Sequence, residues 1–230
     1  MLYADSIVLT LIFSFVTSMG LLGFFMNKFL LMLLLITCAS PAVNAQNLRV
    51  VQIYTDNQLL ELIKENKHLS QVMMDECQLT KDIEVRAIKA KMPSYQFLWG
   101  DMLAYGVCVK KDVLLGLYYM RLAANQGLPE GLEQLGRYYH IGKFMQVDTE
   151  QAIIFLKAAA NSNNLAAQMR LADIYQQGLG SPLDYPMLYS QLHHIVTDNK
   201  VIHKKITKLL VALGEKMPER AVYEAKRVHY

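Results

Sequence analysis

The sequence has few charged residues for its length of 230, and neither sign of charge dominates. Asp, Glu, Lys and Arg make up 19% of it and the formal net charge is +3, which is too small to indicate nucleic acid as the partner. Apolar residues make up 53%, and this share excludes an intrinsically disordered chain. The composition therefore predicts a folded protein but indicates no particular ligand.

Local motifs for catalysis and metal binding are also missing from the sequence. The histidines and cysteines contain no His-x-x-x-His or Cys-x-x-Cys spacing, so a metal site built from neighbouring ligands is not indicated. Neither a Gly-rich phosphate-binding loop nor a Gly-x-Ser-x-Gly turn around a nucleophile occurs. We therefore expect no catalytic residue, no cofactor and no metal ion.

Charge is almost absent from residues 1–45, which contain only two charged side chains. Met26 begins a segment with one Lys, then an apolar run, then small residues. This layout predicts a secretory signal peptide at 26–45. The rest of the chain, 46–230, has an ordinary globular composition and is long enough for one domain or one repeat array.

Residues 1–25 have two interpretations. Either translation starts at Met26 and these residues are an upstream extension, or the apolar segment Ile7–Phe25 spans a membrane, for which its length is sufficient. We favour the first, because a signal peptide with its own initiator Met is complete without the upstream segment. The predicted export leaves two of the three cysteines in the mature chain, Cys77 and Cys108.

A 36-residue repeat occupies the middle of the chain. At this offset glycines, aspartates and small residues align without any insertion, and each unit predicts a helix, a loop and a second helix. Pro93 and Pro129 suit a first helical turn, and Asp148 suits the start of a second helix. The residues that we expect to pack or end these helices are Gly100, Gly106, Gly136, Gly142, Gly178, Ala123, Ala124, Ala159 and Ala160.

Two stretches of the second unit resemble the Sel1-like repeat, a relative of the tetratricopeptide repeat. They are Leu-Gly-x-x-Tyr-x-x-Gly at 135–142 and Ala-x-x-Phe-Leu-x-x-Ala-Ala at 152–160. The resemblance implies an all-α fold, a short right-handed α-solenoid of helical hairpins that binds other proteins. Such arrays need caps at both ends. The expected segments are 46–92 with a capping helix, three repeats at 93–128, 129–164 and 165–199, and a basic capping helix at 200–230.

The two remaining cysteines form an even pair, which in an oxidising compartment is expected to be bonded. In the cytosol two inert buried thiols would be expected instead. A helix over about 79–91, packed antiparallel to a helix over 93–105, would begin beside the end of its neighbour. This arrangement would place Cys77 next to Cys108.

Tyrosines and lysines supply the candidate partner-binding residues. Tyr is favoured in binding hot spots, although about half of the repeat tyrosines are expected in the core. Residues 200–230 contain eight Lys and Arg against three Glu. This excess indicates either the solvated face of a capping helix, which we favour, or a surface that docks on an acidic partner or an anionic membrane. The candidates are Tyr105, Tyr138, Tyr175, Lys204, Lys205 and Lys208.

A second resemblance covers nearly all of residues 50–225 and is to the MotX family of periplasmic proteins of polar flagellar motors. It rests on residues that the repeat does not specify as well as on repeat positions; the main strings are 54–69, 75–79, 82–84, 93–98, 100–104, 106–109, 126–129 and 180–185. The resemblance assigns no catalytic residue and includes both cysteines. It implies a non-enzymatic structural protein, located in the periplasm at the flagellar basal body and peripheral to the membrane.

The same resemblance implies partners. They are a MotY-like protein, with which a T ring is formed, and the periplasmic part of a PomB-like subunit of the sodium-driven stator (PomA–PomB type), which the protein helps to recruit or stabilise. Two alternatives remain open: a secreted Sel1-repeat protein that serves as a general envelope scaffold, and a secreted hydrolase.

Overall fold

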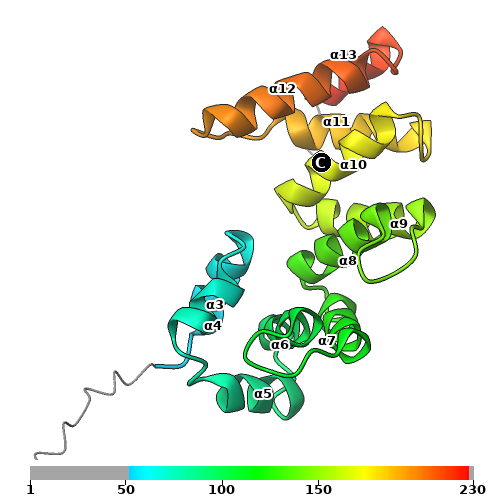
Figure 1. Cartoon of the computed structure of the whole chain (residues 1–230). Helices are drawn as coiled ribbons and strands as arrows, with labels where there is room; N and C mark the ends of the chain where they lie inside the picture. The colour runs from blue at the N-terminus through cyan, green and yellow to red at the C-terminus, as the bar shows by residue number, and fades with distance from the viewer. Residues whose placement is uncertain (1–51, 228–230) are drawn as a thin grey trace, which may run out of the picture. The chain divides into compact units, whose positions relative to one another are not determined.

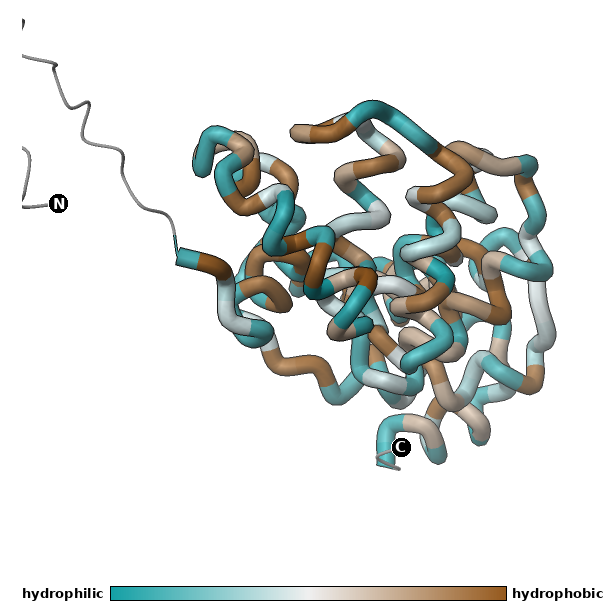
Figure 2. Tube along the Cα trace, turned by 90° about the horizontal axis from the view of Figure 1, so that it is seen from below, coloured by the Kyte–Doolittle hydropathy of each residue, from teal (hydrophilic) through white to brown (hydrophobic). Residues whose placement is uncertain are grey.

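The computed structural model describes residues 52–227, which form α-helices, one short 3-10 helix and connecting loops, with no β-strand among them (Figure 1). The predicted signal peptide at 26–45, the segment 1–25 and the last three residues lie outside this range. Within it, no helix has the length and apolar character needed to cross a bilayer. Figure 2 shows polar residues interspersed with apolar ones along these helices.

Three helices precede the repeats: α3 (Asp56–Lys64), α4 (His68–Met74) and α5 (Thr80–Ile88). The side chain of Thr55 accepts a hydrogen bond from the backbone of Gln58, and the Gln58 side chain accepts one from the Thr55 N–H, which fixes the start of α3. The helix expected at about 79–91 is α5, and it ends three residues early because Lys91 adopts a left-handed conformation before Met92 and Pro93.

The repeats form three helical hairpins. Their first helices are α6 (Pro93–Tyr105), α8 (Pro129–Ile141) and α10 (Leu165–Gln176), and their second helices are α7 (Val113–Asn125), α9 (Thr149–Asn161) and α11 (Tyr185–His193). Gly106 and Gly142 end α6 and α8 in the left-handed conformation, at φ 75° and 69°. The carboxylates of Asp112 and Asp148 accept hydrogen bonds from backbone N–H groups in the first turns of α7 and α9.

The third hairpin departs from this pattern before α11. A 3-10 turn at Pro182–Asp184 precedes the helix, and the Asp184 side chain does not cap it. Its carboxylate lies 2.7 Å from Lys157 Nζ of α9 and accepts a hydrogen bond from the Tyr175 hydroxyl of α10. The aligned aspartate therefore joins two repeats here instead of starting a helix.

Paired helices approach closely at the glycines inside them. A Cβ atom on Gly100 would lie 2.8 Å from the carbonyl oxygen of Gly116 on α7, and one on Gly136 would lie 2.7 Å from Leu156 on α9. Gly116, which the sequence analysis did not include, makes the reciprocal contact with α6. The four alanines expected in repeat packing, Ala123, Ala124, Ala159 and Ala160, are all buried.

Two helices, not the single expected one, follow the repeats: α12 (Lys200–Gly214) and α13 (Glu219–Arg227). The chain breaks between them where Met217 precedes Pro218, whose missing N–H and ring disfavour a continuous helix. Ile206, Leu209 and Leu213 of α12 are buried, and α12 packs on α10 and α11. The apolar side of the C-terminal segment therefore covers the last repeat.

Candidate functional site

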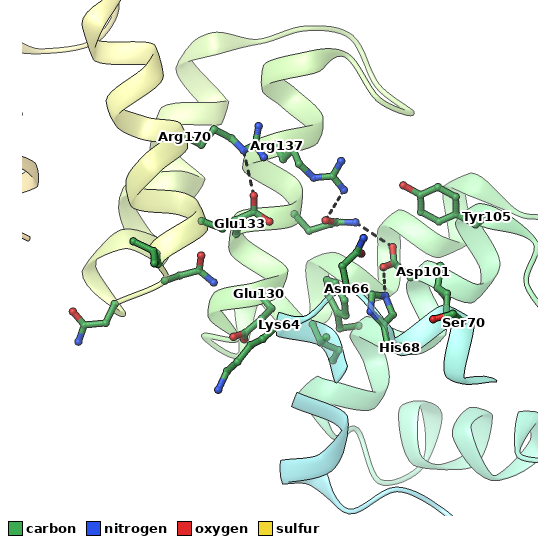
Figure 3. Close-up of a pocket in the computed structure, with 18 of the residues that line it drawn as sticks. Lys64, Asn66, His68, Ser70, Asp101, Tyr105, Glu130, Glu133, Arg137 and Arg170 are labelled. Carbon is green, nitrogen blue, oxygen red and sulfur yellow. Dashed lines mark hydrogen bonds and ion pairs between the residues drawn. The ribbon is translucent and has the colours of Figure 1, made fainter. Parts of the chain in front are cut away.

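A groove of about 920 Å³ lies between α3 and α4 on one side and the first helices of the repeats on the other. One wall consists of Ile63, Lys64, Asn66, His68, Leu69, Ser70 and Met73. The opposite wall consists of Phe97, Asp101, Tyr105, Glu130, Glu133, Gln134, Arg137, Asn163, Asn164, Leu165, Ala166 and Arg170. Figure 3 shows these side chains converging from helices that are far apart in the sequence.

A buried pair of polar side chains lies in the base of the groove. Nε2 of His68 and Oδ2 of Asp101 are 2.7 Å apart, and the two residues are only 3% and 1% exposed. His68 begins α4 and Asp101 lies inside α6, so the hydrogen bond joins the two walls. The other ring nitrogen of His68, Nδ1, is buried and has no hydrogen-bond partner among the residues that the structure describes.

The polar network continues from Asp101 into α8. Oδ1 of Asp101 lies 3.4 Å from both the Gln134 amide nitrogen and the Tyr138 hydroxyl, and the Gln134 amide donates to that hydroxyl at 2.7 Å. The Tyr138 hydroxyl is also 3.0 Å from that of Tyr105. Burial, followed by the nearby charge of Asp101, raises the pKa of Tyr138 well above that of an ordinary tyrosine, so its hydroxyl stays protonated.

Charged side chains of both signs surround the opening of the groove. Arg170 of α10 pairs with Glu133 of α8 at 3.2 Å, and Arg137 donates to the Gln134 side chain at 2.6 Å. Lys64 and Glu130 line the groove from opposite walls (Figure 3). The groove is therefore lined by a mixture of cationic, anionic, amide and apolar groups and not by charge of one sign.

Within residues 52–227, the ring of His68 is hydrogen bonded to Asp101 and to no serine, threonine or cysteine. Ser70, which lines the same wall, donates its hydroxyl hydrogen bond to the carbonyl oxygen of Lys67 at 2.8 Å, not to His68. A Ser-His-Asp arrangement requires the serine to bond to the imidazole. The geometry therefore fits a structural role for the His68–Asp101 pair.

A disulfide bond between Cys77 and Cys108 lies just beyond the C-terminal ends of α4 and α6. It joins the turn between α4 and α5 to the loop after α6, with Cα atoms 5.5 Å apart. The pairing predicted from the order of the helices is present. Together with the His68–Asp101 hydrogen bond, it attaches the wall formed by α3 and α4 to the first repeat.

Comparison with known proteins decides the family. The Sel1 repeat model matches residues 93–128, 129–164 and 165–187. Over 177 residues the chain is 47% identical to the sodium-type polar flagellar protein MotX of Vibrio parahaemolyticus serotype O3:K6, and the match covers 77% of this chain and 84% of that protein. The chain belongs to the MotX family. The third Sel1 match ends at 187, short of the expected bound at 199.

Two solved structures are similar to this member of the MotX family. The Sel1 repeat protein from Oxalobacter formigenes is 21% identical with a TM-score of 0.42, covering 65% of this chain and 98% of that one. A protective antigen of uropathogenic Escherichia coli strains is 19% identical with a TM-score of 0.42, covering 74% of this chain and 43% of that one.

The three candidate tyrosines differ in how exposed they are to solvent. Tyr105 lines the groove and is 39% exposed, so it is available to a partner. Tyr138 and Tyr175 are completely buried, and the prediction that they bind a partner is wrong. The Tyr138 hydroxyl donates a hydrogen bond to Asp101, and the Tyr175 hydroxyl donates one to Asp184. The two rings fill the space between helices.

The candidate lysines lie elsewhere, on α12, and all three are exposed. They are Lys204, Lys205 and Lys208, of which Lys205 lies 3.5 Å from the carboxylate of Asp173. None of them lines the groove.

Sequence reasoning missed the two residues at the base of the groove in this MotX-family chain. The motifs in the sequence indicate neither His68 nor Asp101 as a site residue. One signal was available: Asp101 interrupts the apolar run Phe97–Ala104, and an ionisable side chain in a helix buried on all sides needs a partner.

Proposed function

We propose that this protein is a non-enzymatic structural component of a polar flagellar motor and that it acts in the periplasm. The 47% identity to MotX over most of both chains carries the proposal. The Cys77–Cys108 disulfide supports an oxidising compartment, and the signal peptide predicted at 26–45 agrees with export.

In this proposal the protein forms a T ring with a MotY-like protein and helps to recruit or stabilise a stator unit through the periplasmic part of a PomB-like subunit. A helical-repeat array offers extended surfaces for such contacts. The groove is the surface we assign to a partner segment, because an exposed aromatic ring, Tyr105, lines it together with the charged side chains of Arg137 and Glu133. Tyr and Arg are enriched among residues that dominate binding energy.

Deletion of the gene tests the motor function directly. Loss of swimming with intact, paralysed filaments is the expected phenotype, and restoration by the wild-type gene is the control. A deletion strain that swims normally would contradict the proposal and leave the general envelope scaffold as the better explanation.

Complementation with point variants tests the groove. Tyr105→Ala removes an exposed ring from the groove, whereas Tyr118→Ala removes one from α7 that is 52% exposed and does not line it. We expect Tyr105→Ala to restore swimming poorly and Tyr118→Ala to restore it fully, with both proteins present at equal levels. Equal restoration by the two variants would exclude the groove as the partner site.

Pull-down from envelope extract tests the partners. The mature protein is expected to capture the MotY-like and PomB-like proteins, and to lose them when reductant opens the disulfide. Capture of neither protein by the oxidised chain would contradict the proposed contacts.

A further inference from the structure

A second surface lies on α12. Lys204, Thr207, Lys208, Val211, Ala212 and Glu215, with His203, line a shallow groove of about 670 Å³, and we refer to these residues as the α12 stripe. From Lys204 to Glu215 it follows one side of the helix for about 17 Å at the usual helical rise. That length suits a second helix lying alongside.

The opposite side of α12 is already occupied by the fold. Ile206, Leu209 and Leu213 are buried against α10 and α11, so the helix is held in place and the stripe faces away from the repeats. Val211, in the middle of the stripe, remains 58% exposed. Figure 1 shows α12 at the end of the described helices opposite to α5. In residues 52–227 no segment covers it.

The charges on the stripe are unevenly distributed. Lys204 and Lys208, one turn apart, are exposed and form no ion pair within residues 52–227, whereas Lys205 on the neighbouring side is paired with Asp173. Glu215, the one carboxylate of the stripe, lies at its far end. The lysine end therefore presents uncompensated positive charge beside an apolar centre formed by Val211 and Ala212.

We propose that the α12 stripe docks an acidic amphipathic helix of a partner protein. Such a helix places its apolar side on Val211 and Ala212 and its Asp or Glu side chains beside Lys204 and Lys208, while Glu215 disfavours acidic residues at the other end. The charges fix the position of the partner along α12. This inference does not depend on the motor function, because the exposure and charge of α12 carry it.

A bilayer fits the stripe less well than a helix does. Surfaces that lie on membranes combine basic residues with Trp, Phe or Leu side chains that enter the lipid. The stripe has none of these, and its apolar centre is limited to Val211 and Ala212. Two short aliphatic side chains leave room for a helix alongside but offer little apolar area for membrane insertion.

Binding of a labelled peptide tests the proposal. The probe is a fluorescent amphipathic helix built from Glu, Ala and Leu, measured by anisotropy against the mature chain, Lys204→Glu/Lys208→Glu, and a matched control, Lys89→Glu/Lys110→Glu. The control lysines are also exposed and without an ion pair in the described part of the chain, but lie outside α12. Circular dichroism verifies that all three proteins are folded.

The wild-type chain and the control are expected to bind the peptide with equal affinity, and the α12 variant about tenfold more weakly. Wild-type binding should weaken as salt is raised. Equal binding by the α12 variant, equal binding of a scrambled peptide of the same composition, or a preference for vesicles of anionic phospholipid over the peptide would each overturn the proposal. Motility of the deletion strain is a separate result, so failure here is distinguishable from failure of the motor proposal.

Discussion

The imidazole of His68 is hydrogen bonded to the carboxylate of Asp101 at 2.7 Å, and this buried contact joins the helix that forms one wall of the groove to the first repeat. The residues are 33 positions apart and come from α4 and α6. Without the contact, Nε2 of His68 and Oδ2 of Asp101 would be buried at the base of the groove without this hydrogen bond.

Removal of either partner should therefore destabilise the protein strongly. We expect Asp101→Ala or His68→Ala to lower the free energy of unfolding by about 2–3 kcal/mol, measured by urea denaturation, because the partner left behind is buried without its hydrogen bond. Lys64→Ala is the control, because its ion pair with Glu61 is exposed and should contribute less than about 1 kcal/mol. A loss for Asp101→Ala no larger than for Lys64→Ala would contradict the assigned role.

Replacement of both cysteines should also destabilise the fold. The disulfide closes a loop with a sequence separation of 31 residues. On the loop-entropy model, Cys77→Ser/Cys108→Ser should lose about 3–4 kcal/mol of unfolding free energy, and reductant should have the same effect on the wild type but none on the variant. Non-reducing peptide mapping of the mature protein should find the Cys77–Cys108 peptide; two alkylatable thiols would show that the bond does not form.

Replacement by alanine should destabilise the protein at Gly100 but not at Gly214. A Cβ atom at Gly100 would lie 2.8 Å from the Gly116 carbonyl oxygen, so Gly100→Ala should lower the free energy of unfolding by about 1–3 kcal/mol. At Gly214, also helical, the nearest atom is 3.5 Å away on Tyr189, and Gly214→Ala should be neutral or stabilise by up to about 1 kcal/mol. Thermal and urea unfolding of the two variants measure the difference; equal effects would contradict the close helix approach.

His140 should make stability depend on pH. Burial, followed by the positive charge of Arg170, lowers its pKa below the ordinary value of 6.5, although Asp173 opposes this partly. The unfolded chain therefore binds the proton first as pH falls, and the free energy of unfolding should decrease from about pH 6.5 downward. His140→Gln should have a shallower decrease between about pH 7 and pH 5 in urea titrations. Identical pH dependence in the two proteins would contradict the lowered pKa.

The repeat helices could be located from the sequence because their ends depend on local backbone chemistry. Pro93 and Pro129 fix φ at a first helical turn, and Gly106 and Gly142 adopt a left-handed conformation that other residues avoid. The disulfide could be placed for a similar reason, since the order and direction of two adjacent helices bring Cys77 to Cys108. The helices α3 and α4 lie outside the repeat, and no period indicated them.

The sequence by itself determined the helical array, its period, the close packing at Gly100 and Gly136, and the family. Only the tertiary structure decided where the groove lies, that His68 contacts Asp101, and which of the candidate tyrosines are buried. Tyr105 and Tyr138 both lie in repeat helices, yet one is exposed and the other buried, because exposure depends on which neighbouring helix packs on each side. Helix boundaries follow from local interactions, whereas the groove depends on how α3 and α4 fold back over repeats that are distant in the chain.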